Sequence, residues 1–323
     1  MPIEKVARGY KATCLMDFET SFGEAPDVAA GKLLPLNTFG LNVSRAKNSA
    51  QTLTGRRDAV EPFDGNVDVT GSLTVPVDAR AFPYWLKLLF GAPTTTGTGE
   101  PAAAPYTHLF KPGDEIPSAV IQSRYGTSPA TFGKFTGCKV ASIALQAGGD
   151  GELTATINVT GRNAEYSETD YNAAAESVVM KRFSNFQATL KDGGQVVATV
   201  TQFSLTIDNG LDTSIRTLGS GGLLYDIPEG IMSVTGSMTA LFTSLALLNK
   251  AKAGTEMSLE LGWTIDASNN LTFKLPEVQI QYQGPTVDGP TGVMVEYPFI
   301  AYFNDAADSA CVIATVVNDV ASY

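Results

Sequence analysis

The residues that could support nucleophilic or acid–base catalysis are few. His108 is the only histidine of the chain, so a Ser-His-Asp or Cys-His arrangement would depend on it alone. The three cysteines, Cys14, Cys138 and Cys311, are widely spaced and form no CxxC pair. This inventory excludes a multi-histidine metal site and a zinc cluster. We interpret His108 as a surface histidine near a loop and expect the cysteines to be reduced, buried thiols.

Carboxylates and glycine-rich segments define no clearer site. Asp150, Asp305 and Asp308 leave carboxylate-only calcium binding open, but no spaced acidic loop with a central glycine is present. The glycine-rich segments at residues 148–151 and 219–222 lack the Lys-Ser/Thr ending of a phosphate-binding loop, so we interpret them as turns. The sequence therefore predicts no catalytic, cofactor-binding or metal site, and no enzymatic activity.

A carbohydrate site would need aromatic platforms or paired carboxylates. Trp85 and Trp263 each lie in an apolar periodic segment, which favours packing in the core. No local pair of carboxylates suits glycoside hydrolysis. A carbohydrate-binding or adhesin module would still explain the β-rich pattern, the tryptophans and the glycine-rich loops, so we keep it as an alternative function. A polysaccharide-degrading enzyme on a β scaffold is a weaker alternative.

The composition describes an acidic globular chain. Its 323 residues include 22 Lys and Arg against 33 Asp and Glu, a formal net charge of −11. Such a chain should repel nucleic acid and anionic membranes rather than bind them. The N-terminus has no uninterrupted apolar region, and no segment approaches the ~20 apolar residues of a membrane helix. We expect no membrane contact and assembly in the cytoplasm.

Alternation of apolar and polar residues predicts that most of the chain is β. In residues 66–75 the valines and Leu73 share one face of a strand and polar side chains share the other, and residues 152–160 repeat the pattern. The polar faces of these segments and of residues 257–263 consist of Asp68, Thr70, Ser72, Thr74, Glu152, Thr154, Thr156, Asn158, Ser258 and Glu260. Further strands are predicted at residues 139–145, 183–190, 195–207, 271–282 and 293–303, with a hairpin over residues 183–207.

Two helices are predicted, at residues 79–91 and 241–254, and each ends in glycine and follows a similar strand. Residues 65–74 and 230–239, which are 165 residues apart, are identical at six of ten positions. Such an ordered match indicates an internal duplication.

The duplication predicts two tandem domains, at residues 39–166 and 178–323. Residues 167–177 form the expected linker, and residues 1–38 an N-terminal arm and first strand region. Long excursions at residues 44–64 and 208–229 occupy matching places in the two copies, where contacts with neighbouring molecules are expected. The segments at residues 22–36 and 92–105 are expected to be exposed loops.

The closing strands of the first copy, residues 135–145 (FTGCKVASIAL) and 151–161 (GELTATINVTG), resemble the tail tube protein (major tail protein) family of long-tailed bacteriophages. Residues 203–210, 230–239, 275–285 and 293–303 resemble the central part and final hairpin of the same family. The likeness spans most of residues 39–317. It implies an all-β fold of two small β-sandwich or barrel domains, each with one flanking α-helix.

The resemblance also implies a function. Proteins of this family form rings that stack into a tail tube, the conduit for DNA ejection, in a virion assembled in the bacterial cytoplasm. The expected partners are further copies of the chain and other tail proteins, with double-stranded DNA passing without specific binding. Because the chain has two copies, three chains could close a pseudo-sixfold ring. A hexamer of chains, with the second copy on the tube exterior, is the alternative.

Two sets of site residues follow from this interpretation. The polar strand faces named above are candidates for the surface that faces the tube lumen. Arg56, Arg57 and Arg216, which lie in the two excursions, are candidates for contacts between rings.

Overall fold

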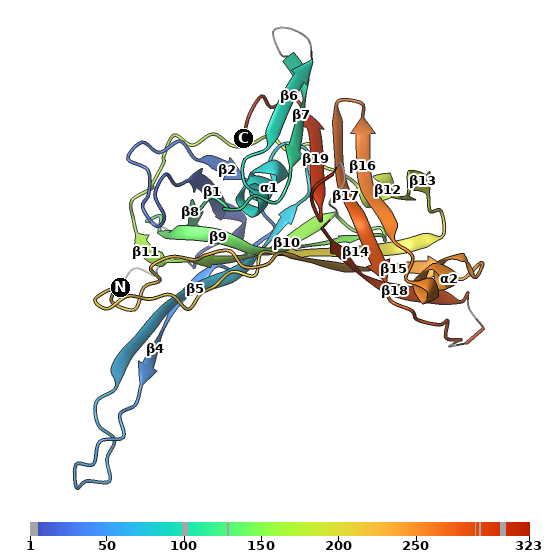
Figure 1. Cartoon of the computed structure of the whole chain (residues 1–323). Helices are drawn as coiled ribbons and strands as arrows, with labels where there is room; N and C mark the ends of the chain where they lie inside the picture. Colours follow the sequence, from blue (N-terminus) through green and yellow to red (C-terminus); the bar gives the residue numbers. More distant parts are fainter. Residues whose placement is uncertain (1–5, 99–102, 128, 288, 291, 304–307) are drawn as a thin grey trace.

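The structure is a computed structural model that describes residues 6–98, 103–127, 129–287, 289–290, 292–303 and 308–323. Among these residues there are 19 β-strands, two α-helices and two short 3-10 helices. All pairings between the strands are antiparallel, and helices cover little of the chain (Figure 1). The prediction of an all-β fold is confirmed.

The largest layer is one sheet that passes through both halves of the chain, and we call it the long sheet (Figure 1). Its strands lie in the order β4, β5, β10, β9, β14, β15, β18, β17, and β3 lies beside β5 in line with β4. The bounds are β3 (Thr38–Phe39), β4 (Asn42–Asn48), β5 (Phe63–Pro76), β9 (Phe132–Ala147), β10 (Thr154–Gly161), β14 (Val200–Asp208), β15 (Ser233–Leu241), β17 (Asn269–Ile280) and β18 (Met294–Tyr302).

Two outer layers pack above the long sheet, because β9 and β17 each extend from it into a second set of strands. In the first half the order is β2 (Lys32–Leu34), β1 (Thr13–Phe18), β8 (Ala119–Arg124), β9 and β11 (Asn163–Ser167). In the second half it is β13 (Gln195–Val196), β12 (Ala188–Asp192), β16 (Met257–Asp266), β17, β19 (Ile313–Asn318), β7 (Ala103–Phe110) and β6 (Thr94–Thr98).

The core lies between these layers, where the apolar face of each alternating strand is buried. Val69 and Leu73 of β5 and Ile157 of β10 are among its residues. Trp85 and Trp263 are also buried there, so the prediction that both pack in the core is confirmed. Their rings are not available as carbohydrate platforms.

Both predicted helices are present but start later than expected, as α1 (Phe82–Phe90) and α2 (Ala246–Ala253). Their final glycines, Gly91 and Gly254, have φ values of 101° and 63°, which only glycine adopts without strain. The apolar α1 is buried against β9, whereas α2 buries only Ala251, exposes Lys252 and pairs the half-buried Lys250 with Asp192 of β12.

Three regions differ from the sequence prediction. Residues 32–34 of the expected loop form β2, which pairs with β1, and β1 itself lies in the expected first strand region but is buried beside β8 rather than extended as an arm. The expected loop at residues 92–105 contains β6 and the start of β7, a threonine-rich hairpin. The predicted hairpin over residues 183–207 is limited to β12 and β13, since β14 pairs with β9 and β15 instead.

Candidate functional site

Seven of the predicted polar residues lie side by side on one face of the long sheet, which we call the polar face. The register of β5 with β10 places Thr70 opposite Thr160, Ser72 opposite Asn158, and Thr74 opposite Thr156. Because alternate residues share a face, the polar face takes in Asp68, Thr70, Ser72, Thr74, Thr154, Thr156 and Asn158. Its other side is the buried core.

The polar face continues into the second half, which sequence reasoning did not foresee. Ser142 of β9 lies opposite both Asn158 and Asp208, and Asp208 lies opposite Ser233 of β15. Asn158 Nδ2 donates a hydrogen bond of 2.8 Å to Ser142 Oγ. The same polar alternation is visible in the sequence of β14 and β15, as Ser204, Thr206, Thr235 and Ser237.

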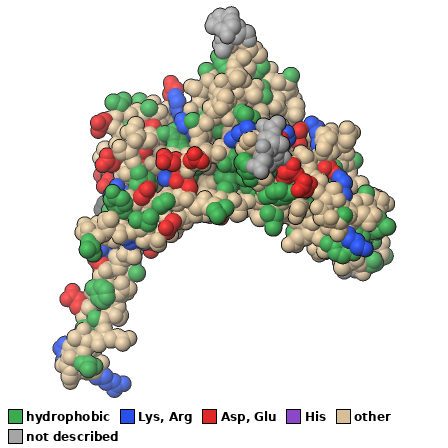
Figure 2. All heavy atoms as spheres, in the orientation of Figure 1, with side chains coloured by type: hydrophobic (Ala, Val, Ile, Leu, Met, Phe, Trp, Pro, Cys, Tyr) green, Lys and Arg blue, Asp and Glu red, His purple; other side chains and the backbone are tan. Residues whose placement is uncertain are grey.

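This face is turned away from α1 and lies on the concave side of the arch that the chain forms (Figures 1 and 2). Most of its side chains are short hydroxyl or amide groups. Ile300 of β18, opposite Thr235, is an exposed apolar exception. A curved, polar and mostly uncharged surface binds water well and offers few groups that hold phosphate.

Two of the predicted carboxylates, Asp68 and Glu152, are paired within the chain. Asp68 Oδ1 accepts a hydrogen bond from Arg216 Nη2 at 2.7 Å. Glu152, which lies just before β10, forms an ion pair with Arg182 at 3.1 Å and accepts a hydrogen bond from Asn37 Nδ2. Neither carboxylate is therefore an isolated charge.

Ser258 and Glu260 do not join the polar face. Both belong to β16, which pairs with β12 and β17 in the outer layer. Glu260 forms an ion pair of 2.7 Å with Lys191 of β12. The alternation that groups them with β5 and β10 in the sequence carries no information about which layer a strand joins.

The three arginines occupy two different environments. Arg56 and Arg57 are exposed near the end of the extended β4–β5 hairpin, where Figure 2 shows basic side chains. Arg216 is instead used within the chain, since its guanidinium also donates to the carbonyl oxygens of Gly222 and Thr213. Arg216 holds the second excursion against β5.

A second contact fastens the same excursion to β9. Lys139 Nζ lies 2.7 Å from Glu229 Oε1 and donates to the Ile227 carbonyl oxygen at 3.0 Å. Burial raises the pKa of Glu229, but the Lys139 ammonium and the Ile116 N–H hold it below its usual range overall. Residues 208–229 therefore pack on the first half, whereas the matching excursion at residues 44–64 extends into solvent (Figure 1).

His108 belongs to a buried cluster at the C-terminus. Its Nε2 lies 2.9 Å from the Val320 carbonyl oxygen, which can only accept, and its Nδ1 lies 2.8 Å from Thr95 Oγ1. The imidazole also packs edge-on against Tyr323. Burial lowers the pKa of His108. The interpretation of His108 as a surface histidine is therefore wrong, because the side chain is completely buried within β7.

The cysteines and acidic residues form no metal centre in the part of the chain that the structure describes. All three cysteines are unpaired, and Cys14 and Cys138 are buried, but Cys311 is only half-buried, so the expectation of burial is wrong for Cys311. Burial raises the pKa of Cys14 to about 12. Asp308 forms an ion pair of 2.8 Å with Lys274, and Asp150 lies exposed in a turn. Asp305 lies outside the described residues.

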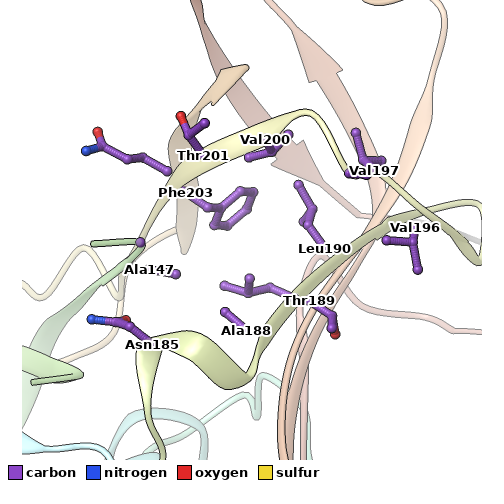
Figure 3. A pocket seen from close by; sticks show the side chains of 14 residues that line it. Ala147, Asn185, Ala188, Thr189, Leu190, Val196, Val197, Val200, Thr201 and Phe203 are labelled. Carbon is purple, nitrogen blue, oxygen red and sulfur yellow. The ribbon is translucent and has the colours of Figure 1, made fainter. Parts of the chain in front are cut away.

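A hollow of about 270 Å³ opens between β12, β13 and β14 (Figure 3). The side chains of Leu190 and Phe203 point into it, and Ala188 and Val200 form part of its wall. Its lining residues include no titratable side chain. The hollow thus supplies no general acid, general base or charged nucleophile.

The sequence matches the family model described as phage tail tube protein over residues 9–301. The match covers most of the chain, and the chain belongs to this family of structural proteins, which assemble with other tail proteins into the stacked tube of the virion tail. A search of curated proteins found no similar sequence. Among the described residues, no helix is long and apolar enough to span a membrane.

Proposed function

We propose that this chain forms rings of three copies with pseudo-sixfold symmetry, and that the polar face lines the conduit through which DNA is ejected. The observation that carries the proposal is the polar face itself, which continues across both halves on the concave side of one sheet. A closed ring of such sheets would present this face to a central channel. The protein would assemble in the bacterial cytoplasm and function in the virion.

The pseudo-sixfold symmetry rests on two copies of one unit in the chain. Asn42 pairs with Thr70 in the first half, and Thr206 pairs with Thr235 in the second, in agreement with the sequence alignment. The pairings of β8 with β9 and of β16 with β17 each contain a bulge at a matching place. These correspondences favour two equivalent units over one unrepeated domain.

The matched strands also suggest where each unit begins. In order, β1, β2, β4, β5, α1, β8, β9 and β10 correspond to β12, β13, β14, β15, α2, β16, β17 and β18. The first copy would then start at β1 rather than at residue 39. The β6–β7 hairpin is an insertion in the first copy, and β19 joins it to β17 of the second.

The two excursions are proposed to contact neighbouring rings. Leu53 and Leu218 each lie in one of the excursions and are 98% and 105% exposed, the largest values among the large apolar side chains described. A leucine this exposed gains about 1.5–3 kcal/mol when it is fully buried. Arg56 and Arg57 lie near Leu53 and could pair with acidic groups of the next ring, while Arg216 would act indirectly by positioning Leu218.

A channel lined by the polar face would lack a strong positive electrostatic field, so DNA could pass through it. Clusters of lysine or arginine in a channel would bind the phosphates of DNA and release the counterions condensed on the DNA. This binding would slow translocation at every ring. Arg216 and Lys139 are already paired with Asp68 and Glu229. The net charge of −11 further disfavours retention of DNA.

Lysine substitutions at equivalent positions of the two copies test this proposal. Thr70→Lys together with Thr235→Lys would place six positive charges at one level of a ring of three chains. We expect intact tubes and slower DNA release, with the delay reduced at high salt. The control carries Thr189→Lys and Thr264→Lys in the outer layer. Unchanged release by virions that carry the first pair would refute a lumenal position for the polar face.

A further inference from the structure

The two halves of the chain are joined by the pairing of β9 with β14. The last residues of β9 pair with β14, with Ile143 opposite Ile207 and Ala144 opposite Thr206. Asn209 N–H donates to the Ala141 carbonyl oxygen at 2.8 Å, which identifies the hydrogen-bonded positions of this ladder. In the proposed duplication, β9 belongs to the first copy and β14 to the second.

The segment that follows β17, the counterpart of β9, offers the same kind of edge and pairs with no second strand among the described residues. Thr160 pairs with Lys139 and Asn158 with Ser142 in the first copy. In the second copy Ile300 corresponds to Thr160, because they lie opposite the matched residues Thr235 and Thr70, and Pro298 corresponds to Asn158. Ile300 pairs with Gln279, and Gln281 N–H donates to the Pro298 carbonyl oxygen at 2.7 Å. Gln281 therefore corresponds to Ser142, and Tyr282 corresponds to Ile143.

Tyr282 illustrates the difference between the two edges. Its side chain is 60% exposed, whereas the corresponding Ile143 is 1% exposed beside β14. Residues 281–284 are exposed and belong to no strand in the described chain. Gln281 directs its N–H toward β18, so in an extended continuation of β17 the N–H and carbonyl groups of Tyr282 and Gly284 would be directed away from β18.

The opposite end of the long sheet has a complementary free edge at β4, which takes part in a ladder with β5 alone among the described strands. Gly40 N–H donates to the Ser72 carbonyl oxygen of β5 at 2.9 Å. By alternation, Asn42 and Ser44 also face β5, and the backbone groups of Leu41 and Val43 face outward. Since β4 corresponds to β14, the free edge of β4 is equivalent to the edge of β14 that pairs with β9.

We propose that residues 281–284 of one chain pair antiparallel with residues 41–44 of a second copy. The register places Ser44 opposite Gln281, Val43 opposite Tyr282 and Asn42 opposite Gln283. The inference rests on the proposed ring and deepens it, because it specifies the residues through which chains join. It makes the contact between chains a repeat of the contact between β9 and β14.

The backbone groups of the two edges match in this register. Val43 with Tyr282, and Leu41 with Gly284, are the outward-facing pairs, so each can exchange two hydrogen bonds. Pro285, which has no N–H, falls opposite Gly40, whose own N–H is directed to β5. No donor is therefore required from the proline.

Side-chain placement supports the same register. Tyr282 would pack on the core side against Val43, as Ile143 packs beside Ile207. Gln281 and Gln283 would extend the polar face next to Ser44 and Asn42. A slip by one residue would move Tyr282 to the polar face and both glutamines toward the core.

Cysteine cross-linking between chains tests the register. Ser44→Cys and Gln281→Cys are made in separate chains, which are mixed, assembled and oxidised. Opposite residues at a non-hydrogen-bonded position have Cα atoms about 4.5 Å apart, within the range of a disulfide. The matched control mixes Ser44→Cys with Gln283→Cys, which would be diagonal neighbours about 7–8 Å apart. Unmodified protein controls for the three native cysteines.

We expect a covalent dimer of chains for the Ser44 and Gln281 mixture, and at least tenfold less for the control. A second in-register mixture, Asn42→Cys with Gln283→Cys, should also cross-link. Electron microscopy of the same samples distinguishes an error in the proposed register from an error in the proposed ring. Tubes with cross-links absent from both in-register mixtures, or favoured by the control, would overturn the register and leave the proposed function standing. Unmodified protein that never forms rings or tubes would overturn both.

Discussion

Ile143 of β9 and Ile207 of β14 lie directly opposite each other, and both side chains are buried. This pair joins the first half of the long sheet to the second and lies on the side opposite the polar face. The chain therefore contains an example of the edge-to-edge pairing that we propose for the ring.

Ile207→Ala should destabilise the folded chain by about 2–4 kcal/mol, because it leaves a cavity at the junction of the two halves. Thr206→Ala is the matched control, since Thr206 is adjacent in β14 but lies on the polar face, and we expect a change within about 0.5 kcal/mol. Urea unfolding followed by circular dichroism measures both. Equal effects of the two substitutions would contradict the assigned faces of β14.

The alternation of the sequence was enough to predict β5 and β10 and the side chains that they share on the polar face. It did not assign Ser258 and Glu260 to the outer layer, because a period of two distinguishes the faces of a strand but not its neighbours. The continuation of the polar face through Ser142 and Asp208 depends on pairing between distant strands, which the sequence pattern does not encode.

The irregular segments were the least predictable from the sequence. Residues 22–36 carry Gly, Pro and Ala without periodicity, yet residues 32–34 form β2 and pair with the buried strand β1. Arg216 was assigned to ring contacts by its place in a long loop, but it is held by Asp68 of the other half. Tertiary contacts of this kind outweigh local composition.

The stability of the chain should fall more steeply in acid because of His108. Its pKa in the folded chain is below the ordinary value of 6.5, so the unfolded chain takes up a proton first as the pH falls. Below about pH 6.5, this lowers stability by up to about 1.4 kcal/mol per pH unit until the folded histidine also titrates. His108→Gln should have a flatter stability curve between pH 7 and pH 5. Parallel curves for the two proteins would refute a neutral, buried His108.

Glu229→Gln should loosen the second excursion, because it weakens the largely buried pair with Lys139. We expect faster hydrogen exchange in residues 213–229 and a loss of about 1–3 kcal/mol of stability. Glu165→Gln removes the more exposed pair with Lys134 and should cost about 0–1 kcal/mol. Unchanged exchange in the excursion after Glu229→Gln would mean that other contacts hold it.

Deletion of residues 51–58 should leave a folded chain that no longer stacks into tubes. The segment is exposed and makes no contribution to the core, so the free energy of unfolding measured in urea should change by less than about 1 kcal/mol. Sedimentation and electron microscopy would report the loss of polymers. Leu53→Ser should weaken stacking without abolishing it, and normal tubes after the deletion would eliminate this excursion as a contact between rings.

The number of chains in one ring tests the central claim most directly. Assembled tubes can be imaged by electron cryomicroscopy, and the chains in one cross-section counted from the density. Our account predicts three chains per ring, related to one another by threefold symmetry, with their six copies arranged in pseudo-sixfold order. Around the ring, the β9–β14 pairing within a chain would alternate with the strand pairing between chains. A ring of six chains, with the second copy of each on the tube exterior, would contradict it.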